Sequence, residues 1–163
     1  MRKAIRSSLL AMALIAVAAG TAGATPGSGL TPVIVSRGVA TDQVHFNTGE
    51  VKVQTKAPVA IVNQTIVFAA TTTPVITTTG WHAHPGVVLV TVTSGTLTRY
   101  DAQCARTVYP TGSAFIESGD HAGLVRNEST TTAASVNVTY LVPEGVQNAD
   151  LRINKANPGC PQS

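Results

Sequence analysis

The sequence predicts an all-β domain, and three observations support this prediction. The chain of 163 residues contains 23 Thr and 21 Val, and such β-branched side chains lose rotamer freedom in helices but fit pleated sheets. Short apolar runs are separated by turn signals, and no helical periodicity extends beyond a turn or two. With 44% hydrophobic and 12% charged residues, the chain is not disordered, and its length suits one ordinary domain. Many short strands favour a sandwich, a jelly roll or a closed barrel.

The first 24 residues have the pattern of a cleaved secretory signal peptide. Three basic residues, Arg2, Lys3 and Arg6, precede an apolar run from Leu9 to Ala19, and small residues follow up to Ala24. The apolar run is shorter than the roughly 20 residues that span a bilayer. We therefore expect a secreted or otherwise extracytoplasmic protein that has no stable membrane anchor after cleavage.

The charge balance changes once this leader is removed. Residues 1–24 carry three of the 11 Lys and Arg residues and none of the 8 Asp and Glu residues, so eight of each sign remain. A formally neutral chain has no basic stripe with which to neutralise phosphates, and nucleic acid is therefore excluded as a partner.

After the leader, the sequence divides into an N-terminal lead-in with a first strand, residues 25–50, and a barrel domain, residues 51–163. Residues 25–32 are rich in Gly, Pro and Ser and are expected to be a flexible lead-in. The predicted strands are Pro32–Val35, Val51–Gln54, Gln64–Ala69, Val75–Thr79, Val87–Thr93, Thr96–Tyr100, Ser113–Ile116, Gly123–Arg126 and Ala134–Val142. Alternation is clearest in the fifth of these, where Val88, Val90 and Val92 share one face and should line the core.

Two of the four histidines lie in one short motif. On a strand, His82 and His84 project from the same face, and their imidazoles are close enough to bind one divalent ion. Trp81 would then point to the opposite face and pack there.

With its continuation, this motif resembles the two conserved motifs of the cupin superfamily. His82 and His84 match the H-x-H of the first motif, and Gly95 matches the glycine that ends it. In the second motif, Pro110-Thr111-Gly112 matches P-x-G and Asn127 matches the closing asparagine. The resemblance covers roughly residues 75–143 and implies a small antiparallel jelly-roll barrel. It is closest to small exported bacterial single-domain cupins of type-2-like sequence, and since cupin barrels often pair through their sheets, it also implies a homodimer as a possible assembly.

Two motif positions depart from this pattern. The glutamate of the first motif falls on Val88, and the histidine of the second falls on Gly123. His121 lies two residues before Gly123, and a bulge or shifted turn near the neighbouring glycines would bring it inward. We therefore expect His82, His84 and His121 to be the candidate metal ligands. Glu117 is interpreted as a surface turn residue, with the alternative that it supplies a carboxylate from the loop before His121.

The two cysteines, Cys104 and Cys160, both belong to the exported part of the chain. Export to an oxidising compartment predicts one Cys104–Cys160 disulfide, with two buried free thiols as the alternative. In the chain-entropy model, a loop this long stabilises the fold by roughly 4 kcal/mol.

The sequence leaves three functions open. The first is a metal-dependent enzyme or binding protein whose His-lined pocket holds Zn, Fe, Mn, Ni or Cu and a small neutral or anionic ligand. The second is a non-catalytic binding or structural module whose metal motif has decayed. The third, with the weakest support, is a cell-envelope interaction protein that uses its Thr-rich faces as the contact surface. The resemblance to cupins does not choose among them, because one fold hosts many activities.

Overall fold

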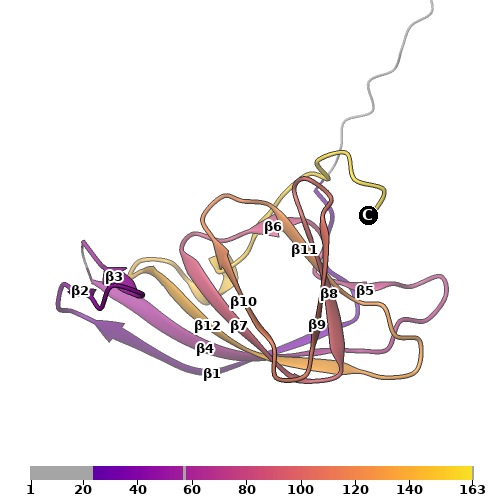
Figure 1. Cartoon of the computed structure of the whole chain (residues 1–163), viewed down its shortest axis with the longest axis horizontal. Coiled ribbons are helices and arrows are strands. Elements are labelled where there is room, and N and C mark those ends of the chain that lie inside the picture. Colours follow the sequence, from indigo (N-terminus) through magenta and orange to yellow (C-terminus); the bar gives the residue numbers. More distant parts are fainter. Residues whose placement is uncertain (1–23, 57, 163) are drawn as a thin grey trace, which may run out of the picture.

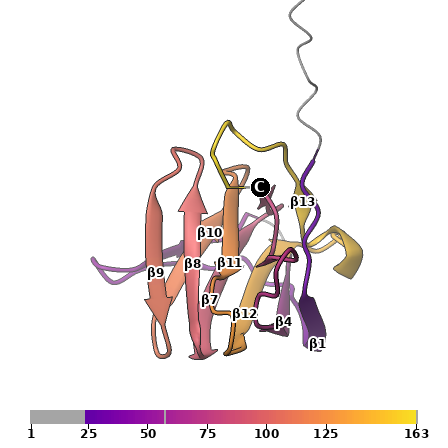
Figure 2. The same ribbon diagram turned by 90° about the vertical axis from the view of Figure 1, so that its right-hand side faces the viewer.

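The fold is an antiparallel jelly-roll barrel made of two main sheets (Figures 1 and 2). The computed structural model describes residues 24–56 and 58–162, so the predicted signal peptide lies, apart from Ala24, outside the described residues. The strands in this part of the chain are β1 (Leu30–Ala40), β2 (His45–Asn47), β3 (Lys52–Gln54), β4 (Val59–Phe68), β5 (Thr77–Thr78), β6 (His82–Ala83), β7 (Val87–Ser94), β8 (Thr96–Asp101), β9 (Arg106–Pro110), β10 (Ala114–Ser118), β11 (Gly123–Asn127), β12 (Ala134–Pro143) and β13 (Ile153–Asn154). A 3-10 turn, η1, covers Asn148–Asp150.

The two sheets have different strand orders, and all their pairs are antiparallel. The five-stranded sheet has the order β1-β4-β12-β7-β10, and the six-stranded sheet has the order β13-β6-β11-β8-β9 with β5 also paired to β11. A separate hairpin of β2 and β3 projects away from the barrel, at the left of Figure 1. Within the described residues, no helix has the length and hydrophobicity needed to cross a bilayer.

The barrel interior is filled by the inward faces of both sheets. The predicted alternation of β7 is confirmed: Val88, Val90 and Val92 are 1%, 6% and 1% exposed, whereas Thr91 and Thr93 face solvent. Phe115 of β10 and Leu97 of β8 belong to the same cluster of buried residues. Each fully buried apolar side chain of this kind contributes about 1.5–3 kcal/mol, so this cluster is the main source of stability.

A second, smaller cluster lies on the other face of the six-stranded sheet. It contains Trp81, Tyr100, Leu124 and Cys160, and Trp81 therefore packs on the face opposite the histidines, as predicted. Cys104 and Cys160 lie at disulfide distance and are bonded, with their Cα atoms 5.5 Å apart.

The N-terminal segment and several short strands differ from the sequence-based expectation. Residues 25–32 were expected to be a flexible lead-in, but Ser28 forms a backbone bridge with Thr78, and β1 starts at Leu30. Strands β2, β9 and β13 were not predicted. These strands are short and largely exposed, so their sequences lack the alternation of buried and exposed residues that identifies a longer strand.

Candidate metal centre

Two histidines and one glutamate converge inside the barrel. His82 and His84 come from β6 and the residue that follows it, and Glu117 comes from β10. All three side chains are buried, with exposed fractions of 4%, 6% and 7%. The Nε2 atom of His84 lies 3.2 Å from Oε2 of Glu117, and that of His82 lies 3.8 Å from the same oxygen. One potential ligand atom from each residue falls within 4.8 Å of the other two.

Backbone carbonyls fix the orientation of both imidazoles. His84 Nδ1 lies 2.8 Å from the carbonyl oxygen of Leu151, and His82 Nδ1 lies 3.0 Å from that of Gly80. A carbonyl oxygen can only accept, so each Nδ1 must carry a proton and donate it. In the neutral rings, the lone pairs are therefore on the Nε2 atoms, which face Glu117.

The backbone just before His82 requires a glycine at position 80. Gly80 has a φ of +65°, and a Cβ there would lie 2.1 Å from the carbonyl oxygen of Thr25. Only glycine adopts this left-handed conformation without strain and also leaves room for the neighbouring backbone. The conformation places the Gly80 carbonyl where His82 can donate to it.

Burial and charge keep the ligand atoms in the forms that bind metals. Burial lowers the pKa of His82 to about 4, although the negative charge of Glu117 partly opposes this shift. Burial alone would raise the pKa of Glu117, but its close contact with His84 and the positive charges nearby outweigh burial and lower the pKa to about 2. One of these charges is the guanidinium of Arg99, whose Nε lies 3.1 Å from Oε1 of Glu117. At neutral pH, His82 is thus a neutral ring and Glu117 a carboxylate.

The arrangement has the donor set that a divalent ion requires, and two of its spacings are close to those around a bound ion. Two ligand atoms, each ~2.05 Å from a tetrahedral ion, lie about 3.3 Å apart, and the two histidine–glutamate separations are 3.2 and 3.8 Å. All three potential ligand atoms lie within 4.8 Å of one another. Because Nδ1 of His84 donates to the Leu151 carbonyl, the Nε2 atom and the Glu117 oxygen that faces it need either a proton or a cation between them. Two histidines and one carboxylate also leave coordination positions open, as in non-haem iron sites. The residues therefore fit a divalent transition metal.

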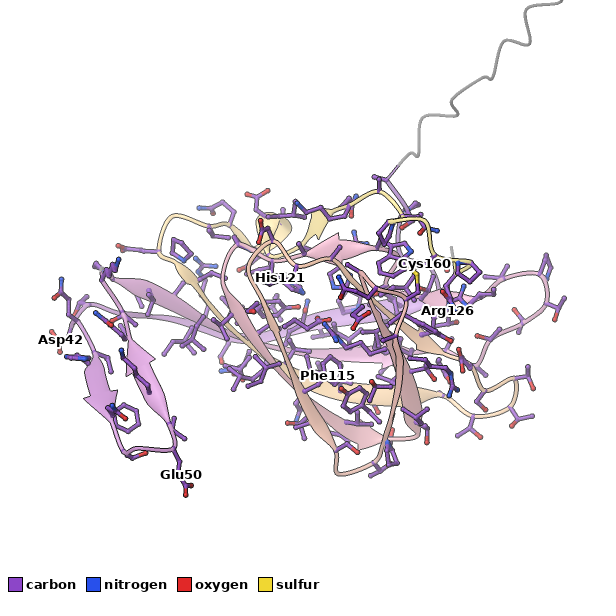
Figure 3. All side chains as sticks on the ribbon, turned by 45° about the horizontal axis from the view of Figure 1, so that its top comes forward. Asp42, Glu50, Phe115, His121, Arg126 and Cys160 are labelled. Atoms are coloured by element: carbon purple, nitrogen blue, oxygen red, sulfur yellow. A yellow bond between two sulfur atoms is a disulfide. The ribbon has the colours of Figure 1, made fainter. Side chains whose placement is uncertain are left out.

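The position of Glu117 corrects the prediction for the third ligand. The structure places His121 on the surface, in the turn between β10 and β11, where it is labelled in Figure 3. The pairings of β10 with β7 and of β11 with β8 show no register shift that would turn it inward. The carbonyl of Gly119 in this turn accepts a hydrogen bond from the backbone N–H of His84. Glu117, interpreted from the sequence mainly as a surface turn residue, instead joins the two histidines.

Both departures from the cupin motifs involve the space around Glu117. Val88, at the position of the motif glutamate, is the direct cross-strand partner of Glu117, so the carboxylate comes from the neighbouring strand on the same face. Gly123, at the position of the motif histidine, pairs with His82, and a Cβ there would lie 3.1 Å from Oε1 of Glu117. The missing side chain leaves room for the carboxylate and for Arg99, whose Nη2 lies 3.4 Å from the same point.

A signal for Glu117 was present in the sequence. Phe115 lies in the predicted strand Ser113–Ile116 and packs in the core, and Glu117 lies two residues further along the same strand, so it shares that face. The predicted strand ends at Ile116, whereas β10 continues to Ser118, and this difference of two residues concealed the candidate ligand.

The site opens into a small and mostly apolar cavity. Its volume is about 40 Å³, and its walls include Val88, Leu97, Phe115 and Tyr140 besides the three candidate ligands. Burial raises the pKa of Tyr140, and the negative charge of Glu117 raises it further. The phenol therefore stays neutral, and its hydroxyl donates to Gln64 rather than toward the histidines. The cavity is large enough for an ion and a few small ligand atoms.

No protein-family model and no curated protein matches this sequence. Among solved structures, a protein from Desulfitobacterium hafniense DCB-2 aligns at 6% identity over 72% of this chain and 82% of its own, with a TM-score of 0.48. A barrel-domain protein from Leptotrichia buccalis aligns at 14% identity over 70% of this chain and 41% of its own (TM-score 0.47). A third, from Thermotoga maritima MSB8, aligns at 13% identity over 60% and 65% (TM-score 0.46). These structural neighbours are described as cupin or cupin-like proteins. At these identities, the chemistry of the site rests on this chain's own residues.

Proposed function

We propose that this chain is an exported cupin-type protein that holds one divalent transition-metal ion with His82, His84 and Glu117 and binds a small anionic ligand beside it. The observation that carries the proposal is the convergence of two oriented Nε2 atoms on one buried carboxylate. Zn, Fe, Mn, Ni and Cu all suit this donor set. The leader-like residues 1–24 and the Cys104–Cys160 pair support export.

When bound, the ion would supply a positive charge and open coordination positions in an apolar cavity. The chain's own residues would orient the ligand side chains. The carbonyls of Leu151 and Gly80 hold the two imidazole rings. Arg99 holds one carboxylate oxygen of Glu117, while the other oxygen faces the histidines. The apolar walls limit access of water, which strengthens electrostatic interactions at the ion. This arrangement suits binding and polarisation of a small anion.

The metal proposal is tested by titrating the protein with zinc. The chain is purified without a His tag, stripped with a chelator and titrated by calorimetry. We expect about one equivalent of Zn²⁺ to bind with a dissociation constant in the micromolar range or below. Binding of less than about a tenth of an equivalent would overturn the proposal.

The second candidate function is a barrel without a metal. It is favoured by the ion pair of Arg99 with Glu117, since the guanidinium already supplies a cation to the buried carboxylate. In that case, the side chains would form a structural network, the apolar cavity would be the ligand site, and the zinc titration would show no binding.

The anionic ligand is inferred from the charge of the loaded site. A divalent ion and Arg99 together carry three positive charges, and Glu117 is the one acidic side chain among the described residues that line the cavity. The ion and Glu117 alone leave a net charge of about +1 in the apolar cavity, where an uncompensated charge is costly, and Arg99 adds a further positive charge beside Glu117. Arg99 is 21% exposed, and only its Nε atom has a protein hydrogen bond in the described part of the chain. Its remaining N–H groups are available to an anion.

We expect Arg99→Gln to weaken anion binding about tenfold. Cobalt-loaded protein is titrated with acetate, and the visible spectrum reports on the coordination sphere. The titrations are made at saturating cobalt, because Arg99 also orients Glu117. Arg106→Gln is the matched control. Arg106 pairs with Glu128, and Glu128 also accepts a hydrogen bond from Tyr100. Tyr100 lies on the face of the six-stranded sheet that points away from the cavity, whereas Leu97 lines the cavity. Equal acetate affinities in the wild type and Arg99→Gln would contradict the assignment of Arg99.

A further inference from the structure

The C-terminal tail, residues 144–162, lies along the segment that carries the two histidines (Figure 1, drawn in yellow). In this tail, β13 is the outer partner of β6, with Asn154 opposite His82 and Ile153 opposite Ala83. The pairing continues beyond the strand, because the backbone N–H of Lys155 donates to the Trp81 carbonyl over 2.9 Å. The tail therefore supplies the edge strand of the six-stranded sheet, next to β6, which carries His82.

The tail also contacts the metal-binding segment through side chains. The carbonyl of Leu151, the hydrogen-bond acceptor for His84 Nδ1, belongs to the tail. Arg152 donates to the carbonyl of Thr79, and Trp81 Nε1 donates to the carbonyl of Gln162 over 3.0 Å. Backbone or side-chain contacts thus reach the segment from residue 79 to residue 84 along most of its length.

The tail is fastened to the barrel near both of its ends. Near its start, Arg37 of β1 donates to Asn148 and to the carbonyls of Glu144 and Val146. Leu151 is 4% exposed and belongs to the main core. At its end, Cys160 is bonded to Cys104 in the loop after β8, where it packs against Trp81 (Figure 3 labels Cys160). Between these anchors, the regular structure is the two-residue strand β13, and such a short pairing is marginal without a covalent anchor.

We propose that the disulfide-anchored tail is a structural part of the metal centre, and that the Cys104–Cys160 bond raises metal affinity by holding the tail against β6. This inference rests on the proposed metal site. Partners that orient metal-binding histidines change metal affinity by 10–100-fold when they are removed. A loosened tail would free β6 on one side and weaken the contact that fixes the ring of His84.

The test compares the wild-type protein with the double variant Cys104→Ser/Cys160→Ser. Serine is preferred to chemical reduction, because free thiols and thiol reductants bind zinc themselves. We expect the dissociation constant for Zn²⁺ to rise at least tenfold in the double variant. Val92→Ala is the control for general loss of stability, since Val92 is buried in β7 and is not among the residues that line the cavity. The zinc affinity of this variant should be unchanged. A threefold or smaller change in a folded double variant would overturn the proposal.

A metal-free measurement separates this inference from the proposed function. Long-range ¹⁵N spectra of the histidine rings should show His84 protonated on Nδ1 in the wild type, with increased tautomer exchange or solvent exchange in the double variant. Identical ring spectra in the two proteins would overturn the tail proposal, whether or not zinc binds. Absence of zinc binding in the wild type, together with changed ring spectra in the double variant, would overturn the metal site and leave the tail as the element that orients His84.

If the double variant does not fold, the coupling can be measured in the wild type alone. Linkage is reciprocal, so a disulfide that strengthens metal binding tenfold is itself made tenfold harder to reduce by the bound metal. The fraction of oxidised protein is measured in reduced and oxidised glutathione, with and without saturating Mn²⁺, which has a much lower affinity for thiols than Zn²⁺ has. We expect Mn²⁺ to shift the thiol–disulfide equilibrium about tenfold toward the disulfide, and an unchanged equilibrium would overturn the proposal.

Discussion

We expect Glu117→Gln to weaken Zn²⁺ binding by at least 100-fold, which corresponds to about 2.7 kcal/mol. The substitution preserves the shape of the side chain but removes the negative charge and replaces a carboxylate oxygen by a weaker ligand. Glu117 is 7% exposed and lies within 3.8 Å of both Nε2 atoms, so no solvent-exposed group can readily take its place. Calorimetric titration of the stripped protein with zinc measures the effect.

The same substitution should also lower the stability of the metal-free fold, because it removes the charged partner of Arg99 and the negative charge that the folded state favours, as the lowered pKa of Glu117 shows. The new amide still offers a donor to Nε2 of His84 and an acceptor to Arg99. Thermal unfolding in the presence of a chelator measures this loss separately, whereas the further stabilisation that zinc gives to the wild type should be absent from the variant. A variant that binds zinc as tightly as the wild type would contradict the assignment of Glu117 as a ligand.

Two matched variants separate this effect from a general effect of charge. Glu128→Gln removes a carboxylate that hydrogen-bonds to Tyr100 and Arg106, away from the barrel cavity, and zinc affinity should stay within about twofold of the wild type. His121→Ala removes the exposed histidine expected from the motif and should also leave zinc affinity unchanged. A large loss in His121→Ala would instead favour the ligand set predicted from the sequence.

The elements that the sequence predicts well are those whose pattern is local. The valines of β7 alternate strictly between core and solvent, and the spacing of His82 and His84 puts both rings on one face of a strand. For these residues, the pleat of one strand decides the direction of the side chain. The fold class follows from the same alternation and from the frequency of turns.

The third candidate ligand could not be placed from the pattern of a single strand. Whether Glu117 or His121 reaches the histidines depends on where β10 ends and on which side chain finds room on the facing strands. Gly123 opposes His82 and has no side chain, so it leaves space that Glu117 and Arg99 occupy. The role of the tail was equally hidden, because two residues of β13 give no periodic signal, and their pairing with β6 joins segments about 70 residues apart.

We expect Asn127→Ala to lower the free energy of unfolding by about 3–5 kcal/mol, the largest effect on stability among the proposed variants. The Asn127 side chain is completely buried, and its amide group donates to the carbonyls of Phe68, Ala69 and Thr132. Its Oδ1 accepts from the backbone N–H of Ser129 over 3.0 Å. Alanine leaves several of these buried groups without a partner, and each such loss costs about 1–3 kcal/mol. Chemical denaturation followed by circular dichroism measures the change.

Asn137→Ala and Asn127→Asp test the physical reason for this loss. Asn137 faces solvent on β12, and its replacement should change stability by less than about 0.5 kcal/mol. Asn127→Asp keeps the acceptor for Ser129 but places a carboxylate oxygen against carbonyl oxygens, so it should be at least as destabilising as alanine at neutral pH. Because the buried acid would have a raised pKa, its deficit relative to the wild type should become smaller as the pH falls and a proton returns to the carboxyl group. A deficit that grows on acidification, or a cost below about 1 kcal/mol for Asn127→Ala, would show that these hydrogen bonds do not join the end of β4 to the loop after β11.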